Sequence, residues 1–575
     1  MMGSCPRHSG NVGGAELILK TVSMQSMQST QSRKLRLGIL LDSFDTPAWA
    51  AGAIRRIAQG NAAEFALVIM NAGVRPVGGD KSRSGIYSLF DRLDRKLFGR
   101  QPDPLALTSI KTLLADVPSM IVHPVPLAAG CGLNELDILA IREYRLDIVI
   151  RIGFEFLSCD RLMLAKYGIW YYYHGDDTRM RGGPSGFWEV VEDRPETGTS
   201  LLATGAENYP CRVLYRSYFF TYPLSPARHR SHYFWAAASF LPRQVEALHY
   251  FGEQEFWRQT GQFNVAASAP LKYYEVPSGV AAVKAIGTIM VRLLRESFKR
   301  LLFLDQWFLL FSLDRGISDG FRAFGSLLPP KDRFWADPHI VRQDGKYYIF
   351  IEEWLHANNK GHISVIELDE SGRWKAPVKI LEQPYHLSYP FVFESDGSFY
   401  MVPETAGNRT IDLYKSISFP YKWEFKETLV RNVKAVDTTL LHYSGKWWLF
   451  TAIAEQEAAA PNVELFLFYS DQLLGGQWEP HPRNPIVSDI KRARPAGAVF
   501  LQDGKLIRPS QNCSVRYGYG FDLNEIQTLS ESEYCERPIC SVRPDWDKNV
   551  LATHTYANHA PLTVIDAFRY VRRLG

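Results

Sequence analysis

The sequence lacks the features of exported, membrane-spanning and nucleic-acid-binding proteins. Its seven cysteines are scattered without Cys-x-x-Cys pairs, and an odd count argues against a disulfide framework. No run of 18 uncharged apolar residues occurs, and residues 1–34 contain no apolar stretch suited to a signal peptide. The net charge is only +4, so no chain-wide field favours nucleic acid. We expect a cytoplasmic protein with reduced thiols, no transmembrane segment, no nucleic-acid partner and no metal site.

What the chain does have is length and apolar content. Its 575 residues exceed the roughly 250 to 300 that one hydrophobic core can organise. The composition is 46% hydrophobic, with 14 Trp, 28 Tyr and 33 Phe, so large cores can form. The pattern along the chain predicts a disordered tail over residues 1–34, an α/β domain over 35–270, a linker helix and closing strand over 271–315, and an all-β domain over 316–575.

The N-terminal half alternates short apolar strands with helices. LRLGILL, FALVIMN and DIVIRIG are continuous apolar runs, and PAWAAGAIRRIA and NELDILAIREY between them have helical periodicity. Strands of this kind, separated by helices, are typical of a parallel sheet covered on both faces. An insertion over about residues 73–125 contains the amphipathic segment SGIYSLFDRLDRKLFG.

The most apolar region, residues 280–313, is interrupted by charged side chains. We interpret it as an amphipathic linker helix followed by a strand. Docking of the helix on a membrane surface is the alternative.

The C-terminal half contains a repeat with a period of roughly 50 residues, which is typical of propeller blades. Its hairpins are DGKYYIFIEE, DGSFYMVPET, SGKWWLFTAI and DGKLIRPSQN, each preceded by a short first strand. The Asp-Gly or Ser-Gly pair supplies the positive φ that a tight hairpin requires. THTYANHAPLTVIDAF resembles a fifth unit, and QWFLLFSL could supply an outer strand that closes the ring. Five four-stranded blades fit the available length.

The segment LDIVIRIGFEFLSCDRLMLAKYGIWYYYHGDDTRMRGGPSGFWEVVEDRPETGTSLL carries a family resemblance. It is similar to formyltransferases that act on amines with a formyl-folate donor. His174 stands at the family's catalytic histidine, and Arg181 opens the Arg-Gly-Gly-Pro loop expected to bind substrate. The resemblance therefore implies a formyltransferase-like α/β domain with formyl-tetrahydrofolate as its cofactor.

Two groups that formyl transfer requires are replaced in this sequence. Tyr172 stands where the family has the Asn that holds the oxyanion, and Asn208 lies near the expected Asp. Both changes argue against formyl-tetrahydrofolate as the cofactor. A degenerate scaffold that binds a sugar nucleotide is the favoured interpretation. A rearranged site that pairs His174 with Asp176 or Asp177, and an active formyltransferase on an amino sugar, are the alternatives.

The phrases FWADPHI, PYHLSYPFVFE, MVPETAGNRTIDLYK, ARPAGAVF and RPSQNCSVRYG carry a second resemblance. They are similar to the N-terminal domain of glucosamine inositolphosphorylceramide transferases, which resembles five-bladed hydrolases of glycoside hydrolase family 43. Asp337 and Asp437 match the hydrolase base and the aspartate that tunes acidity. Arg494 stands where the hydrolases have their acid, and Glu404 is the nearest substitute.

Polar residues at blade strand ends should converge on one channel, because the first strands of the blades line its axis. The candidate catalytic residues there are Asp337, Glu404 and Asp437, and the candidate substrate-binding residues are Glu353, Arg494, Arg508, Gln511 and His554. Carboxylates with arginines suit transfer from an anionic donor. Turn-capping aspartates and blade-bridging arginines are the structural alternative.

We therefore expect a transferase of polysaccharide or glycolipid biosynthesis whose partner is a sugar, a sugar nucleotide or a glycolipid. The alternative is a carbohydrate-binding scaffold built from two degenerate enzyme folds.

Overall fold

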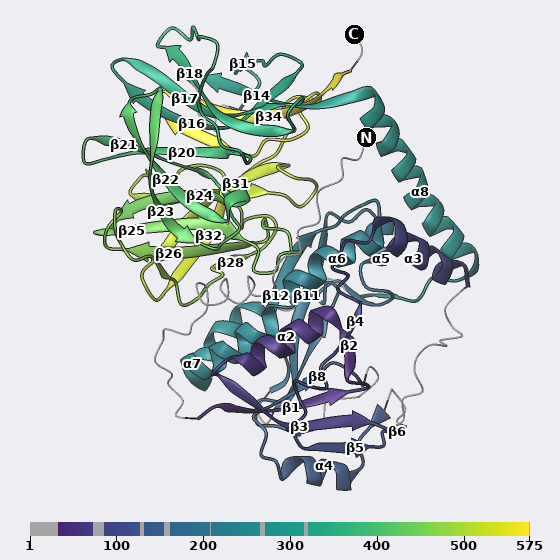
Figure 1. Ribbon diagram of the computed structural model, residues 1–575. Helices are drawn as coiled ribbons and strands as arrows, with labels where there is room; N and C mark the ends of the chain where they lie inside the picture. The colour runs from purple at the N-terminus through teal and green to yellow at the C-terminus, as the bar shows by residue number, and fades with distance from the viewer. Residues whose placement is uncertain are drawn as a thin grey trace.

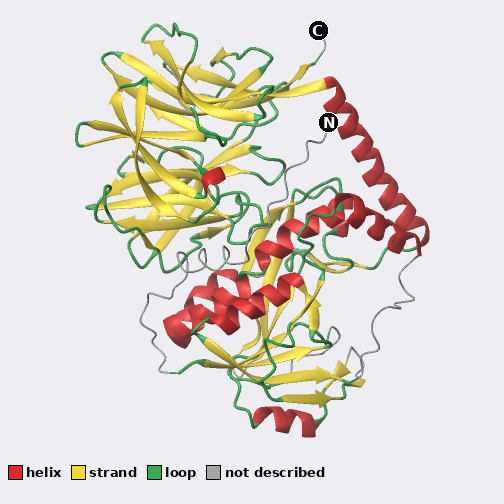
Figure 2. Cartoon of the chain, in the orientation of Figure 1, coloured by secondary structure: helices red, strands yellow, loops and turns green. Residues whose placement is uncertain are grey.

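A computed structural model describes residues 33–72, 85–126, 131–154, 162–206, 209–264, 271–314 and 320–573. It divides into an N-terminal half in which nearly all the helices lie and a C-terminal half built of strands (Figures 1 and 2). Residues 1–32 of the predicted tail lie outside the described part of the chain.

The N-terminal half is organised by a seven-stranded sheet with the order β12-β11-β9-β8-β1-β3-β5. Its five strands from β9 to β5 are parallel, as the apolar runs predicted, and β11 and β12 extend the sheet as antiparallel strands. The strands are β1 (Leu35–Leu41), β3 (Ala63–Asn71), β5 (Ser119–Val122), β8 (Ile148–Arg151), β9 (Ile169–Tyr173), β11 (Glu196–Ala206) and β12 (Tyr209–Phe220).

Helices and short strand pairs surround this sheet. The pairs are β2 (Asp45–Pro47) with β4 (Leu107–Ser109), β6 (Val125–Pro126) with β7 (Cys131–Gly132), and β10 (Met180–Gly182) with β13 (Lys272–Tyr274). The helices are α2 (Ala48–Gln59), α3 (Gly85–Phe98), α4 (Glu135–Arg142), α5 (Phe187–Val191), α6 (Pro226–Ala237), α7 (Phe240–Thr260), η2 (Gly261–Phe263) and the linker helix α8 (Gly279–Leu302).

The C-terminal half is a five-bladed β-propeller, as the repeat predicted. The first four blades are β16 (Arg333–Gln343) to β19 (Val378–Leu381), β20 (Ser388–Ser395) to β23 (Lys422–Arg431), β24 (Ala435–Tyr443) to β28 (Val487–Ser488), and β29 (Phe500–Gln502) to β32 (Tyr534–Val542). Their remaining strands are β17 (Lys346–Leu355), β18 (Lys360–Asp369), β21 (Ser398–Glu404), β22 (Thr410–Ser418), β25 (Lys446–Ile453), β26 (Glu464–Ser470), β27 (Glu479–Pro480), β30 (Lys505–Asn512) and β31 (Gly520–Leu529), with the 3-10 turn η4 (Ala406–Asn408).

The fifth blade closes the ring with strands from both ends of the propeller sequence. Its order is β33 (Tyr556–His559), β34 (Leu562–Arg572), β14 (Phe303–Ser312) and β15 (Gly325–Leu327). β14 is thus the predicted closing strand, although it is third in the blade and β15 is outermost. Each neighbouring pair of blades shares an apolar cluster, so the propeller core consists of contacts between blades.

The two halves also pack on each other. Residues of the third and fourth blades, such as Val463 and Ile490, join the same apolar cluster as Phe240 and Leu241 of α7. At this contact the buried Arg243 donates to both carboxylate oxygens of Glu464 at 2.6 and 2.7 Å. Because both charges are buried, removing either partner would leave an uncompensated charge inside the contact between the halves.

Candidate functional site

The first strands of blades one to three share a bulge at the propeller axis. The pairing register shifts between Ala336 and His339 in the first blade and at the equivalent places in the next two. Asp337, Tyr389 and Asp437 occupy these bulges with φ of 53°, 43° and 52°. Left-handed φ is costly for residues other than glycine, so the surrounding blades must stabilise the same unusual backbone at all three positions.

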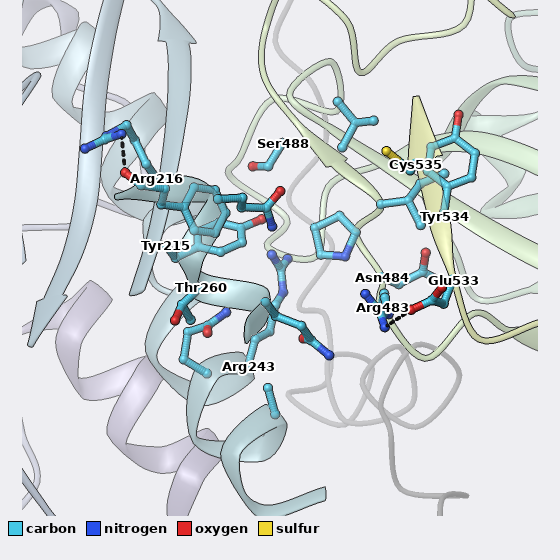
Figure 3. A pocket seen from close by; sticks show the side chains of 18 of the residues that line it. Tyr215, Arg216, Arg243, Thr260, Arg483, Asn484, Ser488, Glu533, Tyr534 and Cys535 are labelled. Carbon is cyan, nitrogen blue, oxygen red and sulfur yellow. Dashed lines mark hydrogen bonds and ion pairs between the residues drawn. The ribbon is translucent and has the colours of Figure 1, made fainter. Parts of the chain in front are cut away.

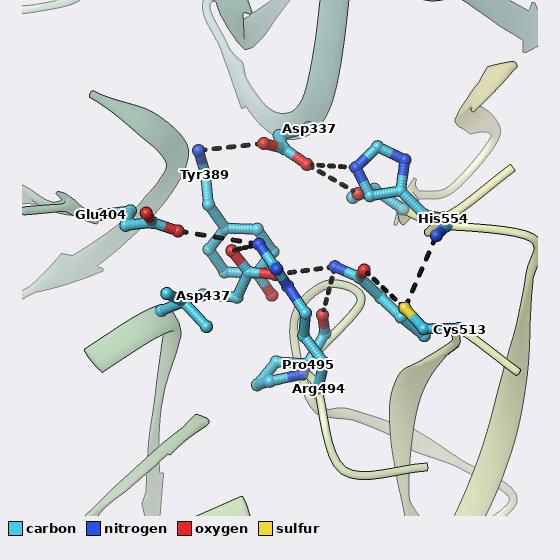
Figure 4. A network of polar contacts seen from close by, with 12 residues as sticks. Asp337, Tyr389, Glu404, Asp437, Arg494, Pro495, Cys513 and His554 are labelled. Atoms are coloured by element: carbon cyan, nitrogen blue, oxygen red, sulfur yellow. Dashed lines mark hydrogen bonds and ion pairs between the residues drawn. The ribbon is translucent and has the colours of Figure 1, made fainter. Parts of the chain in front are cut away.

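The Asp337 bulge is held by a histidine between two carboxylates. His554 Nε2 lies 2.9 Å from Asp337 Oδ1 (Figure 4). His554 Nδ1 lies 3.0 Å from Asp566 Oδ2. Burial opposes the histidine's charge, but the two carboxylates raise the pKa of His554 well above its ordinary value. Despite burial, the hydrogen bond from this imidazolium lowers the pKa of Asp337 to about 2. Asp337 is therefore ionised at neutral pH.

The same three side chains have ligand atoms within 4.8 Å of one another, which is close enough for a metal ion. Both ring nitrogens of His554, however, already face a carboxylate. A histidine that binds metal must be neutral at the binding nitrogen, whereas here the imidazolium itself supplies the positive charge. The three side chains form an ion chain, and binding of a metal ion there would require His554 to lose its proton.

Arg494 joins a second set of groups across the channel. It donates from Nε and Nη2 to the two oxygens of Asp437, and its Nη2 lies 3.7 Å from Glu404 Oε2 (Figure 4). Gln511 donates to Asp437 Oδ2 at 2.7 Å. Burial opposes the charge of Arg494, but Asp437 raises its pKa well above the ordinary value. Four of the predicted site residues, Asp437, Glu404, Arg494 and Gln511, therefore lie together in one cluster.

Three carboxyl groups in this channel have raised pKa values. Burial raises the pKa of Asp437 above its ordinary value, although the charge of Arg494 opposes the shift. Burial, reinforced by the charge of Asp437, raises the pKa of Glu404 to about 8. Burial and the charge of Asp337 raise the pKa of Glu352 well above its ordinary value. Glu404 Oε2 is buried and has no hydrogen-bond partner among the described residues. Glu404 is accordingly protonated at neutral pH.

Glu352 is a member of the site that the sequence analysis missed. In DGKYYIFIEE and DGSFYMVPET the ninth residues are Glu352 and Glu404, whereas Glu353 aligns with Thr405. The pairing register agrees, since Glu352 and Glu404 each lie opposite the residue that precedes a bulge. A residue-by-residue alignment of the repeat would have identified it.

The prediction that Glu353 lines the channel was wrong. Its carboxylate accepts hydrogen bonds from Arg333, Trp335 and Ser364, and it lies 3.1 Å from His362 Nε2. Successive side chains of a strand point to opposite faces, so a one-residue shift moves the carboxylate out of the channel. Burial opposes its charge, yet these hydrogen bonds lower its pKa to about 2. Glu353 is a structural carboxylate of the first blade.

The prediction for Arg508 fails for the same reason. Arg508 donates to both oxygens of Glu536 at 2.7 Å and to the Arg492 carbonyl oxygen at 2.8 Å, within the fourth blade. Gln511, three residues further along β30, points to the opposite face and reaches Asp437. Arg508 therefore has a structural role, but it stabilises its own blade and does not bridge two blades as the structural alternative proposed.

An exposed aromatic ring accompanies the charged groups. Tyr517 is 46% exposed, and the Arg494 guanidinium lies 5.0 Å from its ring centroid. The ring also lies 5.5 Å from that of His554. Tyr517 was not among the predicted site residues. It lies in the loop after β30, outside the repeated hairpin, so comparison of the repeats could not identify it.

The N-terminal candidate His174 lies inside an aromatic cluster. Its ring centroid is 3.9 Å from that of Phe234, 5.0 Å from Trp49 and 5.5 Å from Tyr172. Both ring nitrogens are buried without a hydrogen-bond partner among the described residues, and burial lowers the pKa of His174 to about 3. A neutral histidine sealed among aromatic rings is poorly suited to proton transfer.

The remaining formyltransferase positions do not assemble around this histidine. Tyr172 donates to the Ala237 carbonyl oxygen, and Asp177 accepts from Arg216 and Ser200. Asn208 and the side chain of Arg181 lie outside the described part of the structure. The described groups supply neither a carboxylate for His174 nor an oxyanion donor, so they do not fit formyl-tetrahydrofolate.

A cavity of about 490 Å³ lies between the two halves (Figure 3). Each arginine that lines it has a carboxylate within 3.4 Å; they are Arg216, Arg243, Arg258, Arg483 and Arg492. An anionic ligand would have to displace these carboxylates from the arginines. We therefore interpret the cavity as a polar part of the interface between the halves and not as an anion-binding site.

Comparison with known proteins agrees with the propeller resemblance. Residues 328–560 match the family model described as glucosamine inositolphosphorylceramide transferase 1, N-terminal. Proteins of that name from Oryza sativa subsp. japonica and Arabidopsis thaliana are 35% and 34% identical over 209 and 206 residues. These matches cover 36% and 35% of this chain but only 28% and 27% of the relatives. The chain thus spans little more than a quarter of their length.

Two solved structures with a similar backbone course are glycoside hydrolases. The catalytic domain of a Coprinopsis cinerea α-L-arabinofuranosidase is 12% identical, with a TM-score of 0.31 over 42% of this chain and 92% of that domain. A family 117 glycoside hydrolase from Zobellia galactanivorans is 14% identical, with a TM-score of 0.30 over 47% and 91%. At these scores no activity follows from the likeness. The C-terminal half of this chain is similar to the N-terminal region of glucosamine inositolphosphorylceramide transferases.

Proposed function

We propose that this chain is a transferase of glycolipid or polysaccharide assembly and that the propeller channel is its carbohydrate site. The observation that carries the proposal is the presence in one channel of an ionised carboxylate, Asp337, and a protonated one, Glu404. Their charges affect each other, since the charge of Asp337 contributes to the raised pKa of Glu404.

Transfer of a glycosyl group needs a base that takes the proton of the acceptor hydroxyl and an acid that protonates the leaving oxygen. With a pKa of about 2, Asp337 is a carboxylate at neutral pH and can accept the proton. With a pKa of about 8, Glu404 retains the proton that the leaving group needs. Environments that separate the pKa values of two carboxyl groups assign them opposite roles in this way.

Tyr517 and Arg494 would bind the sugar and an anionic leaving group. An exposed aromatic ring offers a flat apolar face on which a sugar ring can stack. The guanidinium beside it can hold a phosphate with two parallel hydrogen bonds once a ligand competes for it. The names of the relatives, which describe a glucosamine transferase on an inositolphosphorylceramide, agree with a sugar donor and a glycolipid acceptor.

A carbohydrate-binding scaffold is the second candidate, and one observation favours it. Arg494 already donates to both oxygens of Asp437, and it is largely buried beside Glu404. In a scaffold this ion pair would brace the blades, and the channel mouth would bind sugar without turnover.

The experiment measures nucleotide release by the full chain from UDP- and GDP-linked hexoses with an inositol-phosphate lipid as acceptor. A Glu404→Gln variant should lose about 100-fold or more of the turnover while it still binds the sugar, because only the acid is removed. A Tyr517→Ala variant should bind sugar more weakly. Sugar binding without any nucleotide release by the wild type would support the scaffold, and full turnover by Glu404→Gln would exclude the acid role.

A further inference from the structure

The linker helix α8 has two apolar faces, only one of which is used by the fold. Ala282, Ala285 and Ile289 are buried, and Ala285 and Ile289 share an apolar cluster with Phe187 and Val190 of α5. Further along α8, Arg292 donates to the Val190 and Pro223 carbonyl oxygens, so this part of the helix also contacts the N-terminal half. These contacts are sufficient to fix the helix on the N-terminal half.

A second apolar stripe runs along the opposite side of α8. Residues of a helix are about 100° apart, and the exposed apolar side chains of α8 fall within an arc of about 120°. Leu294, Phe298 and Leu301 are 65%, 62% and 69% exposed. The full stripe consists of Val280, Val283, Met290, Val291, Leu294, Phe298, Leu301 and Leu302. A stripe of this length has no role in the core formed by the described residues and marks an interaction surface.

Basic side chains border the stripe. α8 carries Lys284, Arg292, Arg295, Lys299 and Arg300 and a single carboxylate, Glu296. Lys284 and Arg295 are exposed and lie along one edge of the stripe, whereas Arg300, also exposed, points to the other side of the helix. The outward face of α8 therefore combines an apolar centre with a cationic edge.

The neighbouring helix α3 repeats the pattern. Tyr87 of α3 is in the same buried cluster as Ala285 and Ile289 of α8, so the two helices lie side by side. Ile86, Leu89, Leu93 and Leu97 are exposed at intervals of three and four residues, which is one helix face. Arg92 and Lys96, also exposed, border that face. Two adjacent helices thus expose apolar stripes with basic edges.

We infer that α8, with α3 beside it, docks this protein on the surface of an anionic lipid bilayer. An exposed apolar stripe with basic edges is the pattern of a helix that lies in the membrane interface. The positive edge complements anionic headgroups. No helix among the described residues is long and apolar enough to cross a bilayer, so the helix would lie along the surface. Figure 1 shows α8 on an outer side of the molecule, between the two halves.

Such docking would bring the chain to lipid-linked substrates, but it does not depend on the proposed transfer. The test uses the full chain and vesicles of phosphatidylcholine with or without phosphatidylglycerol, and it measures bound protein by flotation. We expect binding to the anionic vesicles, weaker binding to pure phosphatidylcholine, and weakening by added salt.

The variants isolate the stripe. Leu294→Glu with Phe298→Glu should lower binding about tenfold or more, because two apolar anchors become charged. Leu501→Glu is the matched control, since Leu501 is 64% exposed on a propeller strand. It should bind like the wild type. Unchanged binding by the double variant would overturn the inference. So would a wild type that ignores vesicles and forms a dimer that the double variant abolishes, because the stripe would then pair with a second copy.

Discussion

Replacing Glu404 with glutamine tests whether this buried carboxyl group is protonated in the folded protein. Glutamine has the same shape as glutamic acid and, like the protonated acid, carries no charge. Burial and the charge of Asp437 raise the pKa of Glu404 from 4.5 to about 8. Between these two values the unfolded chain loses the proton while the folded chain keeps it.

The sign of the effect follows from proton linkage. The folded state binds more protons than the unfolded state in this window, so wild-type stability falls as the pH rises from 4.5 to 8. The relation gives a loss of about 2 to 3 kcal/mol between pH 5 and pH 7, which the Glu404→Gln variant does not suffer. Relative to the wild type, the variant should gain stability over that interval.

Glu353→Gln is the matched control in the neighbouring blade. The pKa of Glu353 is lowered to about 2, so its contribution is complete above pH 4.5 and is lost as the pH falls toward 2. At pH 7 this variant should be less stable by about 3 kcal/mol. The two substitutions are chemically identical, yet the expected effects have opposite signs.

The assay is the apparent Tm of the full-length variants at pH 5, 6, 7 and 8, measured by scanning calorimetry. The difference between the Tm of Glu404→Gln and that of the wild type should rise by roughly 4 to 5 °C across pH 5 to 7, whereas the Tm of Glu353→Gln should stay below that of the wild type at every pH. If Glu404→Gln were as destabilised as Glu353→Gln at every pH, Glu404 would be an ionised partner of Arg494. The acid role would then be refuted.

Two further predictions concern the N-terminal half and its contact with the propeller. His174→Leu should leave the apparent Tm unchanged or raise it, because a neutral histidine with two unpartnered nitrogens is replaced by an apolar side chain among aromatic rings; a loss above about 2 kcal/mol would reveal a polar role for the ring. Arg243→Ala should destabilise the protein by about 3 to 5 kcal/mol, since Glu464 would be left buried without its cation and Glu455 would retain only Arg56. Limited proteolysis between residues 277 and 330 should then release the two halves faster, and unchanged cleavage would show that the apolar contact suffices.

The fold could be predicted from the sequence because its signals are local and repeated. Each Asp-Gly or Ser-Gly turn specifies a hairpin within ten residues, and four copies at a regular interval indicate a propeller. The parallel strands of the N-terminal sheet likewise follow from apolar runs such as LRLGILL, whose burial on both faces leaves little choice of structure. The closing strand β14 was recognisable for the same reason.

Membership of the channel cluster depends on which face of a strand a residue occupies. Asp337, Asp437 and Glu404 could be proposed from repeat positions, but Glu353 and Arg508 were assigned to the wrong face, because one position along a strand reverses the direction of a side chain. The pairing register of the folded sheet places Glu352 in the channel in place of Glu353, and it places Gln511, which was also proposed from the sequence, on the channel face that Arg508 does not share.

The sequence by itself determined the hairpins, the blades and the sheet, because backbone turns and apolar periodicity act over a few residues. The tertiary structure alone decided the charge states of the candidate site. Glu353 and Glu404 are the same amino acid, yet their pKa values are about 2 and about 8. The difference arises because Glu353 accepts hydrogen bonds from four side chains of its own blade, whereas Glu404 is buried beside the charge of Asp437, which comes from another.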